Sequence, residues 1–91
     1  MNRVYVDFLK TDAVGRLRLI ASGTAADMRR FGIAPSEGLL LGVYSDDVAD
    51  DGVPDNLIAD GLLRFNHELR EWVLEIQPPG IRHESDEVSR P

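Results

Sequence analysis

The residues with the greatest chemical potential in this chain are five aspartates within ten positions of the segment SDDVADDGVPDN. They are Asp46, Asp47, Asp50, Asp51 and Asp55. Carboxylate oxygens at this density are the ligands that Ca²⁺ prefers. The helix-loop-helix calcium pattern fails here, because Ala49 occupies its third position and Ile58 its twelfth. We interpret the segment as a solvated turn and keep a weak cation site as the alternative.

Few side chains are available as ligands for a transition metal, since the chain holds only His67 and His83 and has no cysteine. The stretch that begins at His67 starts like a zinc-protease helix motif, but Glu71 stands where the second histidine is needed. A metal site would require both histidines to converge with carboxylates. No Gly-x-Ser-x-Gly elbow is present for nucleophilic catalysis. We predict a protein with no catalytic residue, no metal and no cofactor, and therefore not an enzyme.

Four arginines are the candidate contacts for phosphate groups, namely Arg16, Arg18, Arg29 and Arg30. They lie in residues 1–30, which carry a net charge of +3, whereas residues 31–63 contain seven acidic side chains and no Lys or Arg. The whole chain carries −6. This balance argues against a general nucleic-acid binder, because phosphate neutralisation needs a basic surface. The four arginines either offset the acidic segment, within the fold or between copies, or bind nucleic acid as the alternative function.

The length and the apolar content predict one domain with one modest core. Ninety-one residues, 43% of them hydrophobic, bury only about two thirds of the surface of the unfolded chain. Charged side chains interrupt the amino-terminal segment, so it lacks the central apolar run of a secretory signal. Residues 38–45 form the longest uncharged apolar stretch and are too short for a membrane helix. We expect a soluble, cytoplasmic protein that does not contact a membrane.

Period-two alternation predicts five strands. Residues 3–9 and 16–19 alternate on either side of turn residues that include Gly15, which predicts a hairpin over residues 3–21. Further strands are predicted over residues 38–45, 56–65 and 72–76, with a hairpin turn at residues 66–69. Phe8, Phe65 and Trp72 fall on the inward-facing positions. The core is therefore expected to be built around these aromatic rings.

A helix of about two turns is predicted between the second and third strands. Thr24 is its candidate cap and Gly32 its candidate end. Residues 84–91 are charged and nearly free of apolar side chains, which predicts a flexible acidic tail behind a domain of residues 1–83. Five hairpin-linked strands and one short helix predict a mainly β fold, a small five-stranded SH3-like barrel whose closure hides the sheet edges.

The second half of the chain also carries a resemblance. The runs EGLLLGVYSDD, PDNLIADGLLRFN, REWVLEI and IRH, within residues 37–83, resemble small bacterial proteins of unknown function with an SH3-like small β-barrel. Similar small barrels serve mostly as binding modules. The resemblance therefore implies a binding role and no assigned catalytic residue or ligand.

The strand over residues 38–45 is apolar on both of its faces. The face away from the core is predicted to present an apolar patch, which often marks a partner surface. Its members are Tyr5, Leu40, Tyr44 and Ile58. In the alternative interpretation, Met28 and Phe31 of the helix cover this patch. We predict a non-enzymatic interaction module that binds a protein partner or a second copy of itself, with nucleic-acid binding through the four arginines as the alternative.

Overall fold

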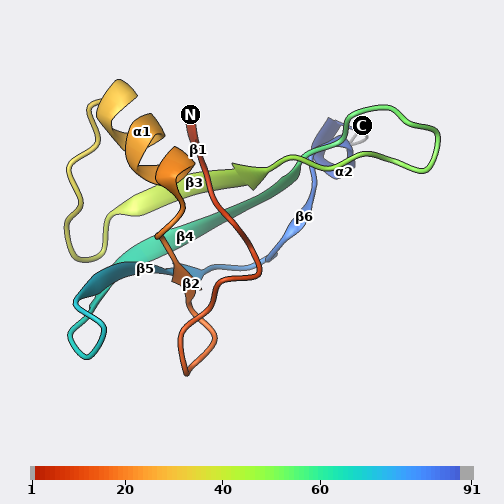
Figure 1. Ribbon diagram of the computed structural model, residues 1–91. Coiled ribbons are helices and arrows are strands. Elements are labelled where there is room, and N and C mark those ends of the chain that lie inside the picture. Colours follow the sequence, from red (N-terminus) through yellow and green to blue (C-terminus); the bar gives the residue numbers. More distant parts are fainter. Residues whose placement is uncertain (1, 89–91) are drawn as a thin grey trace.

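The computed structural model describes residues 2–88, which contain six strands and two helices (Figure 1). The strands are β1 (Arg3–Tyr5), β2 (Leu17–Arg18), β3 (Leu40–Ser45), β4 (Leu57–Asn66), β5 (Glu71–Ile76) and β6 (Arg82–His83). The helices are α1 (Ser22–Arg30) and α2 (Ser85–Val88). A mainly β fold with a short helix between the second and third strands is confirmed.

All six strands belong to one sheet. Its order is β1-β3-β4-β5-β2, and β6 pairs with β4 outside this path. The centre is an antiparallel meander, in which Leu41 of β3 lies opposite Gly61 of β4, and Leu63 of β4 lies opposite Leu74 of β5. β1 and β2, at the two ends, do not pair with each other in residues 2–88. The sheet is therefore open, in contrast to the closed five-stranded barrel that we expected.

The hairpin predicted over residues 3–21 is present only around its turn, where Thr11 and Leu17 form an antiparallel bridge. The pairing expected for the first strand is wrong. β1 runs parallel to β3, with Val4 opposite Val43, whereas β2 lies at the far end of the sheet and pairs antiparallel with β5. The connecting residues 6–16 form turns, and Gly15 takes the positive φ of +86° that the turn needs. Alternation correctly identified Val4 and Leu17 as inward-facing. It could not identify the neighbouring strand, because alternation is a local property and pairing is not.

The core lies on one face of the sheet and is built from aliphatic side chains of all the long strands. Its buried cluster is Val4, Val6, Leu17, Leu41, Val43, Ala59, Leu63 and Leu74. Phe8 and Trp72 pack against this cluster as partly buried residues. Phe65 is half-buried and meets the Trp72 ring edge-on, with centroids 5.2 Å apart. The aromatic rings thus lie at the margin of an aliphatic core and do not form its centre.

Helix α1 begins before its predicted cap. Thr24 lies inside the helix, almost wholly buried, and its hydroxyl donates to the carbonyl oxygen of Tyr5 at 2.6 Å. Capping by Thr24 is therefore wrong, and the same hydroxyl ties the helix to β1. Gly32 ends the helix as predicted, with a φ of +67°, and the N–H of Ile33 donates to the carbonyl of Met28. Neither helix in residues 2–88 has the length and apolar character that a membrane span requires.

The predicted flexible tail lies partly outside the described residues, which end at residue 88. Inside them, α2 follows β6 directly and is bound to the segment between β3 and β4. The N–H of Glu84 donates to the carbonyl of Asn56 at 2.8 Å, and Ser85 donates to the carboxylate of Asp55. Glu84 and Ser85 are therefore bound to the segment between β3 and β4, and a flexible tail over residues 84–91 stays a prediction.

Candidate functional site

Three of the four residues predicted to form the interaction surface lie in one row across the sheet. Tyr5, Tyr44 and Ile58 are register partners on β1, β3 and β4. The rings of Tyr5 and Tyr44 meet edge-on, with centroids 5.7 Å apart. Ile58 is only 1% exposed, and Arg82 on β6 flanks it on the side opposite Tyr44. Burial also raises the pKa of the Tyr44 phenol. This part of the predicted surface is therefore largely covered.

Helix α1 covers Tyr5 and closes the outer edge of β1. The N–H of Tyr5 donates to Asp27 Oδ2 at 3.0 Å, and its carbonyl accepts the hydroxyl of Thr24. Gly23 lies against the Tyr5 ring, since a Cβ at this position would be 2.9 Å from Cδ2. An open strand edge is a template for pairing with another chain. Asp27, Thr24 and Gly23 of the helix occupy this edge, so it is not open to another chain. Met28 and Phe31, which were expected to cover the two tyrosines, pack on the core.

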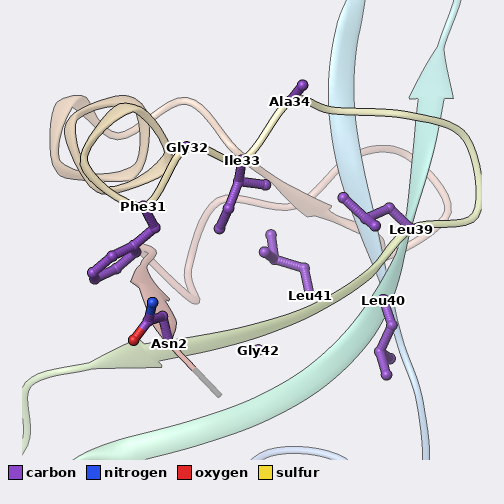
Figure 2. Close-up of a pocket in the computed structure, with 9 residues that line it drawn as sticks. All are labelled: Asn2, Phe31, Gly32, Ile33, Ala34, Leu39, Leu40, Leu41 and Gly42. Carbon is purple, nitrogen blue, oxygen red and sulfur yellow. The ribbon is translucent and has the colours of Figure 1, made fainter.

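Leu40, the fourth predicted surface residue, is 53% exposed at the start of β3. It borders a groove of about 390 Å³ between the start of β3 and the chain that follows α1 (Figure 2). Ile33 and Leu41 point toward one another across this groove, and Leu40 points to the other side of β3 (Figure 2). The apolar residues of the lining are Phe31, Ile33, Ala34, Leu39, Leu40 and Leu41. Apolar surface therefore continues from the groove around the start of β3.

The groove exists because β1 covers only part of β3. β1 pairs with Gly42, Val43 and Tyr44, whereas β3 begins two residues earlier at Leu40. The chain after α1 passes above this uncovered segment (Figure 2), and no ladder joins it to β3 on that side in the described chain. Gly42 contributes no side chain to fill the floor. The short length of β1 therefore leaves an open apolar site at one end of the sheet.

The end of α1 places positive charge beside the groove. The guanidinium of Arg30 stacks on the ring of Phe31, 4.8 Å from its centroid, and its side chain is largely exposed. Its ion pair with Asp27 is loose, with an N–O distance of 3.4 Å. Arg29 is exposed and makes no ion pair with any residue that the structure describes. The groove thus combines an apolar lining with two accessible arginines.

The four arginines of the predicted basic patch do not form one surface. Arg16 Nε lies 2.8 Å from Asp12 Oδ2, and Arg18 binds both carboxylate oxygens of Glu71 at 2.9 Å. The hydrogen bond with Glu71 raises the pKa of Arg18, and the hydrogen bond from Arg18 lowers the pKa of Glu71. These two arginines lie at β2, and the other two lie at the opposite end of α1 (Figure 1).

The acidic segment between β3 and β4, residues 46–56, forms a hairpin that we term the arm. Val48 and Pro54 form a bridge, and the N–H of Ala49 donates to the carbonyl of Val53 at 2.8 Å. Gly52 takes a φ of +84°, as a three-residue hairpin turn of this kind requires. The arm projects past the end of β3, away from the rest of the sheet (Figure 1). Its Val48 and Val53 side chains are 59% and 56% exposed.

The base of the arm is fastened to β6 and α2, through contacts that we term the clasp. His83 Nε2 lies 2.8 Å from Asp47 Oδ2, and Ser85 donates to Asp55 from its hydroxyl at 2.6 Å and from its N–H at 3.0 Å. Hydrogen bonds from His83 and Ser85 lower the pKa values of Asp47 and Asp55, and the bond to Asp47 raises the pKa of His83. Of the arm's aspartates, Asp47 makes an ion pair within residues 2–88, whereas Asp46, Asp50, Asp51 and Asp55 make none.

Ligand geometry for a metal ion is missing from the described chain. No three His, Asp or Glu side chains in residues 2–88 are grouped closely enough to hold one. His83 faces Asp47, whereas His67 packs edge-on against Phe65 with centroids 5.0 Å apart. The two histidines therefore do not converge.

Comparison with known proteins leaves the family open. No protein-family model matches the chain, and no curated protein or solved structure matches it significantly. The resemblance of residues 37–83 to small bacterial SH3-like proteins stays a prediction. The groove and the arm are therefore the features of the molecule that bear on its function.

Asp12 is a structurally important residue that sequence reasoning assigned only to a turn. Its side chain is 1% exposed, and its oxygens accept hydrogen bonds from the N–H groups of Val14 and Arg16, from Arg16 Nε and from Asn66 Nδ2. Burial raises the pKa of Asp12, but these donors outweigh burial, so the pKa lies below its ordinary value. The signal in the sequence was the Asp12-x-x-x-Arg16 spacing around Gly15.

Proposed function

We propose that this protein is a small non-enzymatic binding module that holds an apolar segment of a protein chain in the groove beside β3. The observation that carries the proposal is the groove itself, about 390 Å³ in volume and lined almost wholly by apolar residues. Small-molecule sites of this volume usually add several converging polar groups that orient the ligand. Here Asn2 is the one polar side chain of the lining. An apolar peptide segment therefore fits the lining better than a small polar ligand.

The scaffold suits such a role. In this proposal the curled sheet acts as the SH3-like small barrel that the sequence resembles, with its core held by residues such as Leu63 and Leu74. Recognition then uses the margin of the sheet, where Leu40 is exposed and where β1, which pairs only with residues 42–44, leaves the start of β3 without a strand on that side. A groove held by a packed core needs little rearrangement on binding, which limits the entropy lost.

The alternative function, nucleic-acid binding through the four arginines, has less support. A phosphate would have to displace Asp12 from Arg16 and Glu71 from Arg18. The alternative predicts retention on RNA or DNA at low salt that declines steeply as salt rises. We expect no retention.

Selection of peptides displayed on phage against the immobilised chain tests the proposal. We expect the selected peptides to be rich in apolar residues and to bind more than tenfold more weakly to the Leu40→Asp variant. Leu40 belongs to the apolar surface that continues from the groove around the start of β3, so this substitution places a charge at the margin of the site. Leu40 is 53% exposed, so the fold tolerates the change. Binding is measured by titration of the peptide into labelled protein by NMR.

Leu9→Asp is the matched control, because Leu9 is 89% exposed and lies outside the groove. Its affinity for the selected peptides should equal that of the wild type. A screen that selects no peptide, or peptides that bind both variants equally, would refute the groove as the binding site.

A further inference from the structure

We infer that the occupant of the groove is the arm of a second copy of this chain, so that copies associate head to tail. This inference rests on the proposed function of the groove and names its partner. The arm and the groove complement each other in position, in apolar character and in charge.

The positions of the two surfaces make the contact intermolecular. The groove lies at Leu40, the first residue of β3, and the arm leaves β3 after Ser45. Six strand residues separate the two surfaces by about 20 Å. The arm continues past the end of β3, away from the start of that strand (Figure 1), where the lining residues place the groove. The longest dimension of the molecule is 41 Å. Because the clasp holds its base at Asp47 and Asp55, the arm cannot turn back to its own groove.

Both surfaces present apolar side chains that are exposed or, at Ile33, only partly buried against the core. The arm presents Val48 and Val53, each more than half exposed, and the exposed ring of Pro54. The groove presents Ile33 and, at its border, Leu40. Removing these groups from water together is favourable. A narrow hairpin that projects from the domain is the shape that a groove between a strand and a loop can accept.

The charges at the rims of the two surfaces are opposite. Asp50 and Asp51 at the tip of the arm make no ion pair in the described chain. Beside the groove, Arg30 stacks on Phe31 of the lining and holds Asp27 only loosely at 3.4 Å. Arg29 precedes it in the last turn of α1 and makes no ion pair in the described chain. A carboxylate from a second copy therefore meets a guanidinium group that no strong internal pair occupies.

Two acidic contributions oppose this attraction and set the conditions for the test. Glu37, in the loop before β3, carries a negative charge, part of which is offset by Arg64 at 3.5 Å from its carboxylate. The whole chain carries −6, so two copies repel each other at long range. At about 0.15 M salt the screening length is about 8 Å, which suppresses the long-range repulsion and spares charges in direct contact. Association should therefore be measured at 0.15 M salt and weaken at 1 M.

The contact joins two different surfaces, which determines the kind of assembly. A heterologous contact leaves one arm and one groove free at the ends, so it builds rings or open chains. One groove and one hairpin tip make a small interface, and we expect association that grows with protein concentration up to about the millimolar range. The clasp orders the arm in advance, which reduces the entropy lost on docking.

Sedimentation velocity at increasing concentration, with variants that disable each surface, tests the inference. Leu40→Asp disables the groove and leaves the arm intact. The double substitution Val48→Ser and Val53→Ser disables the arm, without added charge, at two exposed positions. We expect the wild type to form species larger than dimers, and each variant alone to sediment as a monomer. Near-ultraviolet circular dichroism verifies that both variants are folded.

An equimolar mixture of the two variants provides the sharpest measurement. One arm and one groove remain functional in the pair, so the mixture should form a dimer that cannot grow further. Leu9→Asp should behave as the wild type. A wild type that stays monomeric at millimolar concentration, association that survives Leu40→Asp, or a mixture that stays monomeric would each overturn the inference.

Failure of this inference and failure of the proposed function give different results. A monomeric wild type whose selected peptides are lost on Leu40→Asp would overturn the second copy as occupant and retain the groove as a binding site. A monomeric wild type that selects no peptide would overturn both.

Discussion

The two ends of β3 differ in charge and in the way they expose apolar residues. At its start, Leu40 borders a groove beside the arginines that end α1. At its finish, after Ser45, the chain continues into an acidic hairpin that carries Val48 and Val53 on its surface. Between the two ends, Leu41 and Val43 face the core and are almost wholly buried. A single strand therefore supplies the core and, at its two ends, two complementary exposed surfaces.

The contrast between the buried middle of β3 and its two exposed ends distinguishes residues that maintain the fold from residues that are available to a partner. Asp47 and Asp55 accept hydrogen bonds from distant residues, His83 and Ser85. By contrast, Asp50 and Asp51 make no ion pair in the part of the chain described, and Asp51 accepts a local hydrogen bond from the N–H of Val53. Similarly, Leu63 is fully buried and contributes to stability through its packing, whereas Leu40 is more than half exposed and contributes little. Variants can therefore disturb either the fold or the partner surfaces separately.

The largest effect is expected from Leu63→Ala. Leu63 is fully buried in the centre of the sheet, so truncation leaves a cavity and should lower the free energy of unfolding by about 2–5 kcal/mol. Leu40→Ala, on the neighbouring strand, should lower it by less than about 1 kcal/mol, because the side chain is more than half exposed. Urea denaturation measures both values. Equal losses at the two positions would refute the separation between core and groove.

A smaller loss is expected from Asp12→Ala. The substitution removes a charged acceptor of part-buried hydrogen bonds from Val14, Arg16 and Asn66, which should cost about 1–3 kcal/mol at pH 7. Because the pKa of Asp12 is lowered in the folded protein, its stabilisation is complete above the unfolded value of about 3.9. It is lost as the pH falls through the lower folded value.

Asp50→Ala, in the exposed arm, is the matched control for Asp12→Ala. It should change the free energy of unfolding by no more than about 0.5 kcal/mol. The measurement is urea denaturation of both variants and the wild type between pH 7 and pH 2. A gap between Asp12→Ala and the wild type that stays constant down to pH 2 would contradict the assignment of a charged Asp12.

The smallest effect concerns the clasp at the base of the arm. Asp47 raises the pKa of His83, so the stabilisation from this pair is complete below the unfolded value of about 6.5 and is lost as the pH rises through the folded value. Asp55 and Asp86 also face His83 and act in the same direction. The NMR titration midpoint of His83 should therefore lie above about 6.5 and decrease in Asp47→Asn.

Asp46→Asn provides the control for the clasp, since Asp46 is the neighbouring aspartate and makes no hydrogen bond or ion pair with His83 in the described chain. Its effect on the His83 midpoint should be smaller than that of Asp47→Asn. If both variants lowered the midpoint equally, the general negative charge of the arm, and not the Asp47 contact, would account for the shift.

Local features of the fold could be predicted from the sequence, and long-range pairing could not. The strands of the meander were predicted because alternation and turn residues act over a few positions. Tyr5, Leu40, Tyr44 and Ile58 were also correctly assigned to one face of the sheet. Their burial depends on Arg82 and on α1, which are distant in sequence, so only Leu40 remained exposed as expected.

The acidic segment shows the same division. Its five aspartates are equivalent in the sequence, but Asp47 and Asp55 find partners 36 and 30 residues away, at His83 and Ser85. No local pattern connects these positions. The hairpin turn at Gly52 is local, and a turn was predicted there, whereas the projection of the whole arm depends on how β3 and β4 are placed.

The most direct test of the account is an NMR dilution series of the labelled wild-type chain at 0.15 M salt. The account predicts that concentration shifts two groups of backbone resonances together, around Leu40 and Ile33 at the groove and around Val48 and Val53 on the arm. Resonances of β2 and of the turn at Asp12 should stay fixed. Shifts confined to other surfaces, or a spectrum that does not change with concentration, would contradict the head-to-tail contact.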